Sequence, residues 1–273
     1  MSIGKLQIID NMFSHVNSSS LYTNRDGYPT NFEWVNYGVD DKIVLTDTSL
    51  HHVHNNTIKD KKKYAWLLES PLVTSSHYKF VKDNFDKFEE VFTFDSELLK
   101  LSPKFTLVPL GGCWVEPGDR LVHEKTMNTS IIASGKNFLQ GHKLRHDIIT
   151  RFDNIDIFGR EYNPIEKKII GLKDYRFHIV IENCKKDYYF SEKLIDCFVT
   201  GTIPIYWGCP SIGDFFDTDG IIMFDGIGDL DHILSTLNEE LYLSKISSVT
   251  NNFTRSQDFI VADDILYNKI NGF

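Results

Sequence analysis

Hydrophobic positions in the middle of the chain follow the order strand, helix, strand. Residues 177–181 form a short apolar run typical of a buried strand, and residues 202–207 form a second one. Between them, apolar side chains recur at helical spacing over residues 191–201, with Ser191 placed as an N-cap and Gly201 placed to end the helix. This pattern predicts a right-handed crossover unit with two parallel strands.

The same alternation extends along the rest of the chain. Strands are predicted at residues 3–9, 43–47, 64–71, 91–97, 106–112 and 128–136, and helices at residues 78–88, 142–152 and 258–270 and from near residue 229. Short connections between such elements are typical of parallel sheets covered by helices. We expect an α/β chain with two Rossmann-like domains facing across a cleft, at residues 1–122 and 123–273, with a polar linker at residues 114–125.

Composition mainly excludes functions. The chain has 273 residues, of which 41% are hydrophobic and 25% charged, as in ordinary globular proteins. Its net charge of −9 disfavours nucleic acid and anionic membranes as partners, although an anionic small molecule can bind where the local field is positive. No run approaches the ~18 consecutive apolar residues of a membrane span. The first residues lack the pattern of a signal peptide. We expect a soluble, cytoplasmic protein without a transmembrane segment.

Motifs for metals and redox cofactors give no convincing site. No G-x-G-x-x-G follows the first predicted strand, which disfavours a nicotinamide or flavin dehydrogenase. No C-x-x-C pairing or metal spacing connects the four cysteines, which we expect to be buried or idle thiols: Cys113, Cys184, Cys197 and Cys209. His51, His52 and His54 share no spacing with other ligands, so we expect a solvated loop there. Asp217 and Asp219 have the Asp-x-Asp spacing of some metal sites, but a turn is the favoured interpretation.

Candidate chemistry gathers where the helix of the central unit is predicted to begin. A helix N-terminus offers unpaired N–H groups and partial positive charge to a phosphate. Lys193 lies in the first turn, where a cation opposes the helix dipole unless an anion meets it. With Glu192 beside it and Asn183 and Tyr189 before it, Lys193 can hold a pyrophosphate. Arg145, on the helix after another strand, can clamp a phosphate with two hydrogen bonds. A solvent-exposed ion pair on an ordinary helix is the alternative interpretation.

The run ENCKKDYYFSEKLIDCFVTGTIPIYWGCP, residues 182–210, resembles the signature of the α-1,3-fucosyltransferase family, family 10 of the glycosyltransferases. The family pattern has an ENS-like turn, a Tyr-x-Thr-Glu-Lys run at the helix start, and a Val/Ile-Pro strand that ends in Gly-x-Pro. In this chain, Ser191 stands in place of the usual Thr and keeps its hydroxyl. SIIAS followed by Arg145, IDIFGR, LLESP and FDSEL…VPLGG are similar to further family motifs.

The resemblance implies the two-domain GT-B fold and transfer of L-fucose from GDP-fucose, with inversion, to a hydroxyl of a glycan acceptor. The acceptor would bind the N-terminal domain and the nucleotide sugar the C-terminal domain. The donor-binding positions that it implies are Asn183, Tyr189, Ser191, Glu192, Lys193 and Arg145. Arg145 and Lys193 would also act catalytically, because they stabilise the leaving diphosphate. Because these two side chains are positively charged, we expect no obligatory metal or other cofactor.

Glu69, in the sequence ESP, falls where the general base of the family is sought. A Glu that caps a helix or pairs with a nearby lysine is the alternative, and Asp95, Glu97 and Asp47 are the other candidate bases. Two different functions stay open: transfer from another nucleotide sugar, and carbohydrate binding by an inactive relative. A lectin needs no pyrophosphate clamp, so the group at residues 192–193 with Arg145 favours the enzyme.

Overall fold

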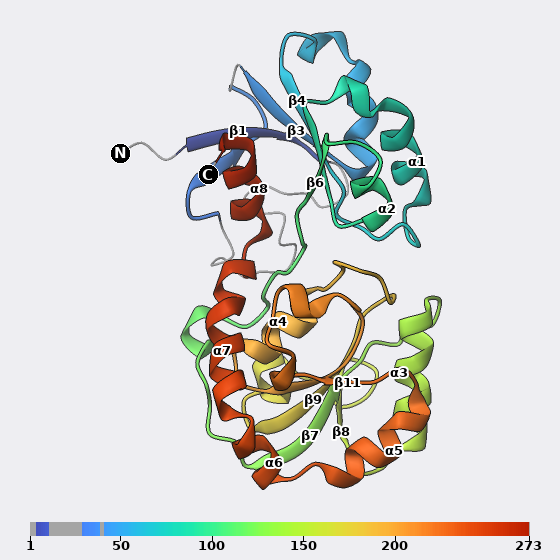
Figure 1. Cartoon of the computed structure of the whole chain (residues 1–273), viewed down its shortest axis with the longest axis vertical. Coiled ribbons are helices and arrows are strands. Elements are labelled where there is room, and N and C mark those ends of the chain that lie inside the picture. Colours follow the sequence, from blue (N-terminus) through green and yellow to red (C-terminus); the bar gives the residue numbers. More distant parts are fainter. Residues whose placement is uncertain (1–3, 11–28, 39–40, 273) are drawn as a thin grey trace. The chain divides into compact units, whose positions relative to one another are not determined.

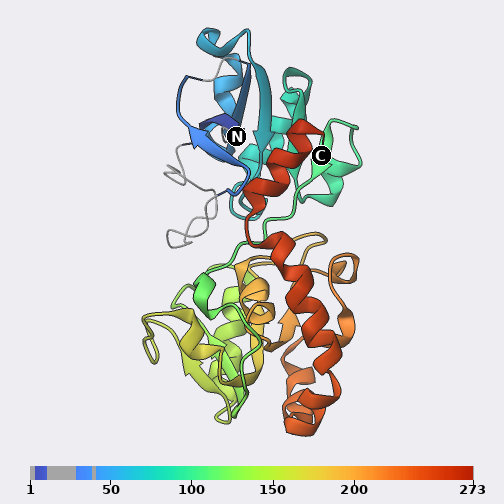
Figure 2. The same cartoon turned by 90° about the vertical axis from the view of Figure 1, so that its left-hand side faces the viewer.

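The computed structural model describes residues 4–10, 29–38 and 41–272. The chain divides into two compact units: unit 1 comprises Met1–Leu110 and Val261–Phe273, and unit 2 comprises Gly111–Ile260. The boundary expected after residue 122 therefore falls inside unit 2. The C-terminal helix returns to unit 1, as Figure 2 shows. The backbone N–H of Trp114 donates to Asp196 at 2.7 Å, which attaches the start of the predicted linker to unit 2.

Unit 1 is built on a six-stranded parallel sheet in the order β2-β1-β3-β4-β5-β6. Strands β1, β3, β4 and β6 of this sheet are labelled in Figure 1. Its strands are β1 (Gly4–Ile9), β2 (Phe32–Val35), β3 (Lys42–Thr46), β4 (Lys62–Trp66), β5 (Glu90–Thr93) and β6 (Phe105–Leu107). Ile43, Val44 and Leu45 of β3 are each 0% exposed, because helices cover both faces of the sheet.

Two groups of helices cover the sheet of unit 1. The helical segments are η1 (Asp47–His54), η2 (Asn56–Ile58), α1 (Ser75–Asn84), η3 (Phe85–Lys87), α2 (Ser96–Leu99) and α8 (Ala262–Asn271). Leu266 of α8 joins the apolar cluster on one face. Val81 of α1 and Leu50 of η1 join the cluster on the other. His51 and His54 are exposed to solvent, as expected, but the histidine run is not a loop. Residues 47–54 form a 3₁₀-helix because Leu50 and Val53, three residues apart, are buried against the sheet.

Unit 2 has a five-stranded parallel sheet in the order β11-β10-β9-β7-β8. Strands β7, β8, β9 and β11 of this sheet are labelled in Figure 1. Its strands are β7 (Met127–Ile132), β8 (Asp156–Phe158), β9 (Tyr175–Ile181), β10 (Ile203–Trp207) and β11 (Ile222–Met223). Its α-helices are α3 (Gln140–Arg151), α4 (Glu192–Phe198), α5 (Ile227–Thr236), α6 (Glu239–Ser244) and α7 (Ile246–Ser256). Short 3₁₀ turns join them: η4 (Pro117–Asp119), η5 (Lys168–Gly171), η6 (Ile212–Asp214), η7 (Thr218–Gly220) and η8 (Gln257–Phe259).

The crossover unit predicted from the sequence is confirmed. β9 and β10 are paired in parallel, with Phe177 opposite Ile203, and α4 lies between them in the chain. The side chain of Ser191 caps α4 by accepting from the N–H of Lys193. Gly201 has φ +71, a left-handed conformation that glycine adopts without strain and that ends the helical segment.

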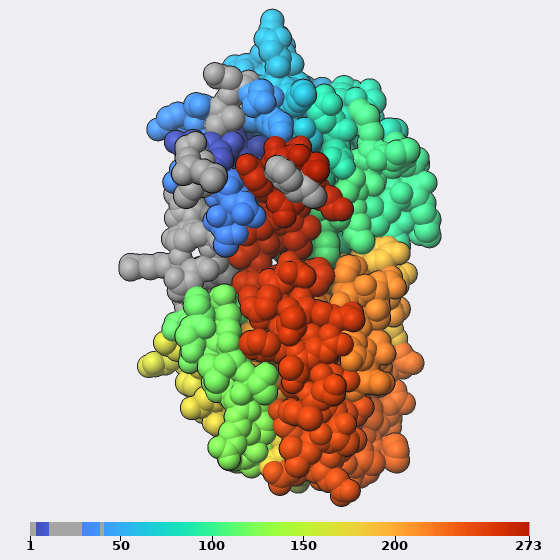
Figure 3. All heavy atoms as spheres, turned by 60° about the vertical axis from the view of Figure 1, so that its left-hand side comes forward, coloured from blue at the N-terminus to red at the C-terminus, as the bar shows by residue number. Residues whose placement is uncertain are grey.

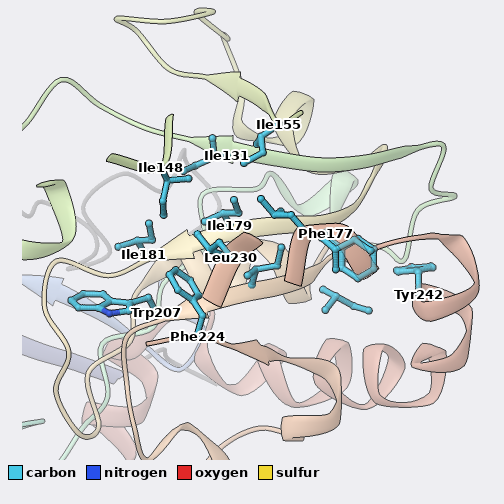
Figure 4. Packing of buried hydrophobic residues seen from close by; sticks show 14 of the residues in the cluster. Ile131, Ile148, Ile155, Phe177, Ile179, Ile181, Trp207, Phe224, Leu230 and Tyr242 are labelled. Atoms are coloured by element: carbon cyan, nitrogen blue, oxygen red, sulfur yellow. The ribbon is translucent and has the colours of Figure 1, made fainter. Parts of the chain in front are cut away.

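The core of unit 2 follows from the alternation of side chains along β9. Phe177, Ile179 and Ile181 point to one face and pack with Ile148 of α3 and Leu230 of α5 (Figure 4). The same cluster includes Val249 of α7. The outer side of the helix α7 lies at the surface of unit 2 (Figure 3).

His178 of β9 is a buried histidine whose ring has a hydrogen-bond partner. Its Nδ1 lies 2.7 Å from the hydroxyl of Ser130, which donates to the carbonyl of Gly171. Burial, with Lys168 and Lys125 adding to it, lowers the pKa of His178 to about 3, so the ring is neutral.

The four cysteines are also buried and free of disulfides. None of the helices in the described ranges has the length and hydropathy that a membrane crossing requires.

Candidate functional site

The winding of the second sheet changes direction between β7 and β9. From β7 the chain passes to β8 on one side and then to β9 on the other. In open parallel sheets, ligands bind beyond the carboxyl ends of the strands at such a switch point. Glu182 and Asn183 follow directly on the carboxyl end of β9, and the predicted donor-site residues of unit 2 are grouped around them.

Arg145 extends from α3 to this strand end and is only 7% exposed. Its Nε and Nη2 donate to the carbonyl of Ile181, and Nη2 also donates to the Asn183 side chain at 3.3 Å. Burial lowers the pKa of Arg145, while Glu182 and Glu192 oppose the shift. A guanidinium stays protonated in proteins. Nη1 donates to no acceptor among the described residues, so it can donate to a ligand.

The start of α3 lies against the loop after β9. The N–H of Gly141 donates to the carbonyl of Asn183 at 3.3 Å. A Cβ at position 141 would lie 1.8 Å from the carbonyl oxygen of Glu182. Only glycine allows this approach, and the approach brings Arg145 to the carbonyl of Ile181.

Glu182 ties the strand end to the start of α4, and it was missed in the sequence. Its side chain is 0% exposed and accepts from the N–H of Ser191 at 2.8 Å and from the Ser191 hydroxyl at 2.7 Å. The Nζ of Lys193 lies 3.6 Å from the same carboxylate and donates to the Ser191 hydroxyl at 2.9 Å. A glutamate in a polar run gives no signal of burial, so only the fold identifies it.

Glu192 lies between two lysines. Its carboxylate is 3.4 Å from the Nζ of Lys193 and 3.4 Å from the Nζ of Lys168. Burial opposes the ionisation of Glu192, but the two cations outweigh it and lower its pKa to about 2. Lys168 also pairs with buried Asp196 at 2.7 Å and lies over the ring of Trp114 at 4.0 Å. Glu192 is therefore a fixed carboxylate of the site, and the surface ion-pair interpretation does not describe it.

The cation of Lys193 is met by carboxylates of the protein. Glu182 and Glu192 both lie within 4 Å of its Nζ, and its side chain is 28% exposed. The N–H groups of Ser191 and Lys193 already have acceptors in Glu182 and Ser191. Positive charge for a ligand thus comes from the side chains of Lys193 and Arg145 more than from the start of α4.

The loop between β9 and α4 places two adjacent tyrosines differently. Tyr189, which was expected to bind the nucleotide sugar, is 4% exposed. It is among the groups that oppose the lowering of the Arg145 pKa. Tyr188 is half-buried and has φ +63, a left-handed conformation that is strained for a tyrosine. Its N–H donates to the hydroxyl of Ser211 at 3.0 Å.

His142, in the first turn of α3, is a second residue that the sequence did not identify. It is 3% exposed. Burial, with Arg145, Lys136 and Lys193 adding to it, lowers its pKa to about 4, so the ring is neutral at pH 7. Three cations therefore act on the start of α3, and one of them, Lys193, is also paired with Glu182 and Glu192.

Glu69 belongs to unit 1 and lies in the segment after β4. The predicted strand at residues 64–71 ends at Trp66, because the chain turns before Pro71 and the carbonyl of Ser70 accepts from the N–H of Val73 at 2.9 Å. Glu69 is half-buried, and its carbonyl accepts from the hydroxyl of Tyr78 at 2.7 Å. Within the described ranges, no group of three or more His, Cys, Asp or Glu side chains could hold a metal ion.

Comparison with known proteins places the chain beside fucosyltransferases. It is 38% identical over 61 residues, 22% of its length, to "Alpha-(1,3)-fucosyltransferase FucT" of Helicobacter pylori. It is 24% identical over 262 residues, with 76% of the chain covered, to "Putative fucosyltransferase R654" of Acanthamoeba polyphaga mimivirus. The matches span 13% and 44% of these relatives, so the chain covers less than half of either. No protein-family model matches the chain.

Two solved structures of an α1,3-fucosyltransferase, one with GDP and one with GDP-fucose, share the fold. They align with TM-scores of 0.58 and 0.57 at 17% identity, over 94% of this chain and 89% and 90% of theirs. The α/β fold of two parallel sheets is thus the GT-B type that the motifs implied. The resemblance to α-1,3-fucosyltransferases is confirmed, and the similarities support a glycosyltransferase.

Proposed function

We propose that the protein transfers L-fucose from GDP-fucose to a hydroxyl of a glycan acceptor, with inversion at the anomeric carbon. The observation that carries the proposal is the pair of cations at the switch point of unit 2. Nη1 of Arg145 meets no acceptor there within the described ranges, and Lys193 has a partly exposed ammonium. A diphosphate carries the charge and the acceptor oxygens that such a pair binds. The proposed donor site also takes in Asn183, Tyr189, Ser191 and Glu192.

In the proposed reaction, the acceptor oxygen attacks the anomeric carbon as the bond from that carbon to the diphosphate breaks. The electron pair of the broken bond leaves on GDP, and Arg145 and Lys193 stabilise the growing negative charge. Two residues within the site are already fixed for this task, because Asn183 and Ile181 hold the guanidinium and Glu182 and Ser191 hold the ammonium.

The acceptor hydroxyl must lose its proton during the attack, and a carboxylate within hydrogen-bond reach is a suitable group. We assign this role to Glu69 of unit 1, where the resemblance places the base. Glu69→Gln keeps the shape of the side chain and removes its basicity. The variant should bind GDP like the wild type and transfer sugar at least ~10²-fold more slowly.

Metal independence is part of the proposal. Two side-chain cations can supply the charge that a divalent ion supplies in other transferases, so turnover should persist in EDTA. A loss of turnover in EDTA that Mg²⁺ or Mn²⁺ restores would show that a metal is needed.

The test is release of GDP from GDP-fucose, followed with and without a panel of free oligosaccharides. An accepted oligosaccharide should accelerate release and become fucosylated, and its anomeric linkage, read by NMR, should be inverted relative to the donor. Turnover of a UDP-sugar in place of GDP-fucose would identify a different donor. GDP binding without turnover of any donor would favour the carbohydrate-binding relative that has lost activity.

A further inference from the structure

The sheet of unit 1 has its own switch point, between β1 and β3. The chain passes from β1 to β2 on one side and to β3 on the other. Asp47 is the first residue after β3, and the hydroxyl of Thr46 donates to Asp10, just after β1, at 2.8 Å. The next strand, β4, is paired in parallel with β3, so Asp47 and the segment that carries Glu69 leave the sheet at the same edge.

Asp47 holds the backbone of that segment. Its side chain is 0% exposed, and Oδ1 accepts from the N–H of Leu68 at 3.3 Å. Burial raises the pKa of Asp47, while His77 and the backbone N–H groups of Leu68 and Glu69 oppose the shift. The carboxylate thus contacts the chain on the amino side of Glu69.

The contact from α1 completes the arrangement. The hydroxyl of Tyr78 donates to the carbonyl of Glu69 at 2.7 Å. Its neighbour His77 places Nδ1 3.8 Å from Oδ1 of Asp47. Two elements therefore hydrogen-bond to the backbone around Glu69: η1 to the N–H of Leu68 through Asp47, and α1 to the carbonyl of Glu69 through Tyr78.

Asp47 is a costly residue for a purely structural role. Its φ of +31 lies in the left-handed region, which is uncommon for residues with a Cβ although Asp adopts it more readily than most. Its Oδ2 is buried without a hydrogen-bond partner in the described part of the chain. A buried carboxylate with an unused oxygen destabilises the fold relative to a neutral side chain, and such costs gather at functional sites.

We propose that Asp47 and Tyr78 are positioning residues that hold Glu69 for the proton transfer. The inference rests on the proposed function, because it assigns their effect to the base. Asp47 does not itself take the proton. It fixes the backbone from which the Glu69 carboxylate projects, and a displacement of about 1 Å at a reacting group can cost ~10²-fold in rate.

Substitutions of Asp47 separate positioning from proton transfer. Asp47→Ala removes both acceptor oxygens and should lower kcat about 10-fold, with the KM for GDP-fucose unchanged, since the proposed donor residues belong to unit 2. Asp47→Asn keeps one acceptor oxygen for the N–H of Leu68 and should retain at least about half of the wild-type kcat. A proton acceptor at position 47 would be inactivated equally by Ala and Asn.

A double-mutant cycle with Glu69→Gln tests whether Asp47 acts through Glu69. If Asp47 acts only through Glu69, Asp47→Ala/Glu69→Gln should be no slower than Glu69→Gln alone. Tyr78→Phe, which removes a single hydroxyl, should show the same non-additivity and serves if Asp47→Ala does not fold. Asp263→Ala is the matched control. It removes another buried aspartate of unit 1, which accepts from Trp34 at 2.6 Å, and should lower the melting temperature without changing kcat.

The assay is GDP release from GDP-fucose with an accepted oligosaccharide. Equal loss in Asp47→Ala and Asp47→Asn, full activity in Asp47→Ala, or additive losses in the double variant would each overturn the inference while the proposed function stands. A Glu69→Gln variant with more than about half of the wild-type kcat would remove the base that the inference needs. Absence of turnover in the wild type would instead overturn the proposed function.

Discussion

The surroundings of Lys193 explain why a cation is tolerated at the start of α4. A cation in the first turn of a helix opposes the dipole, but α4 has only 7 residues and two carboxylates lie within 4 Å of the Nζ. The fold therefore tolerates the charge. Because 28% of the side chain is exposed, the ammonium can still contact a ligand.

Lys193→Ala should lower turnover by roughly 10²–10³, the range for the loss of one donor that stabilises a developing charge. The fold should persist with a lower melting temperature, because Glu192 keeps Lys168 as a partner whereas buried Glu182 loses its ammonium. Steady-state kinetics with GDP-fucose and thermal unfolding measure the two effects. Lys167→Ala, which breaks an exposed pair with Glu116 in the same unit, is the control and should leave turnover unchanged. Full activity of Lys193→Ala would remove Lys193 from the site.

Arg145 needs a different substitution because it is buried and donates to a backbone carbonyl. Arg145→Ala would leave that carbonyl without its donor, so a fall in activity could come from a fall in stability. Arg145→Lys keeps the charge and removes the planar fork of donors. We expect it to weaken GDP binding and slow turnover, with a smaller loss of stability than in Arg145→Ala, as measured by calorimetry and thermal unfolding.

Glu192 should contribute to stability in a pH-dependent way. Its folded pKa of about 2 lies below the ordinary value of 4.5 for a glutamate, so its contribution is present above about pH 4.5 and is lost as the pH falls towards 2. At pH 7 the contribution is at most about 3 kcal/mol. Glu192→Gln should therefore unfold at a lower temperature than the wild type at pH 7, and the gap should narrow below about pH 4.5. A gap that is constant from pH 3 to pH 7 would contradict this assignment.

At the scale of the elements, the sequence predicted strands and helices well where buried residues recur at a regular spacing. β9, α4 and β10 agree with the prediction because their apolar runs are bounded by an N-cap and a glycine. α7 was missed although Ile246, Val249 and Phe253 have helical spacing, because polar residues separate them. The ends of strands were predicted less accurately than their middles. The apolar run at residues 64–68 continues beyond the last paired residue of β4.

Part of the proposed site was predictable because its residues are close together in the sequence. Ser191, Glu192 and Lys193 are consecutive in the sequence, and a helix start brings them together. Arg145 and Asn183 are hydrogen-bonded although they are far apart in the chain, and only the resemblance to a family linked them. Glu182 and Lys168 gave no signal, because the burial of a charged residue depends on partners that the fold supplies.

The contact between α3 and the loop after β9 gives a prediction at this scale. Gly141→Ala would place a Cβ 1.8 Å from the carbonyl oxygen of Glu182, so the start of α3 must move. We expect a loss of about 1–3 kcal/mol in the free energy of unfolding, as for other overpacked positions, and weaker GDP binding because Arg145 moves with the helix. Urea unfolding and calorimetry measure both. Gly118→Ala, where nothing lies within 4 Å of the added Cβ, should behave like the wild type.

At the scale of the whole molecule, the proposed donor site brings several cations together in an acidic chain. The net charge is −9, yet Arg145, Lys193 and Lys136 all act on the neutral ring of His142. Affinity should therefore depend on the phosphates that meet these cations, and it should fall when a phosphate is removed. All the proposed donor residues belong to unit 2, whereas the proposed base belongs to unit 1.

Nucleotide binding to the full chain tests the central claim most directly. Thermal unfolding is followed with GDP, GMP, UDP and ADP at equal concentrations, for the wild type and for Lys193→Ala. GDP at ~100–1,000 times its Kd should stabilise the wild type by about 3–4 kcal/mol, as mass action requires, and GMP should do far less. Lys193→Ala should lose most of the difference between GDP and GMP. The account would be contradicted if GMP stabilised the protein as much as GDP, or if UDP or ADP shifted the melting temperature and GDP did not.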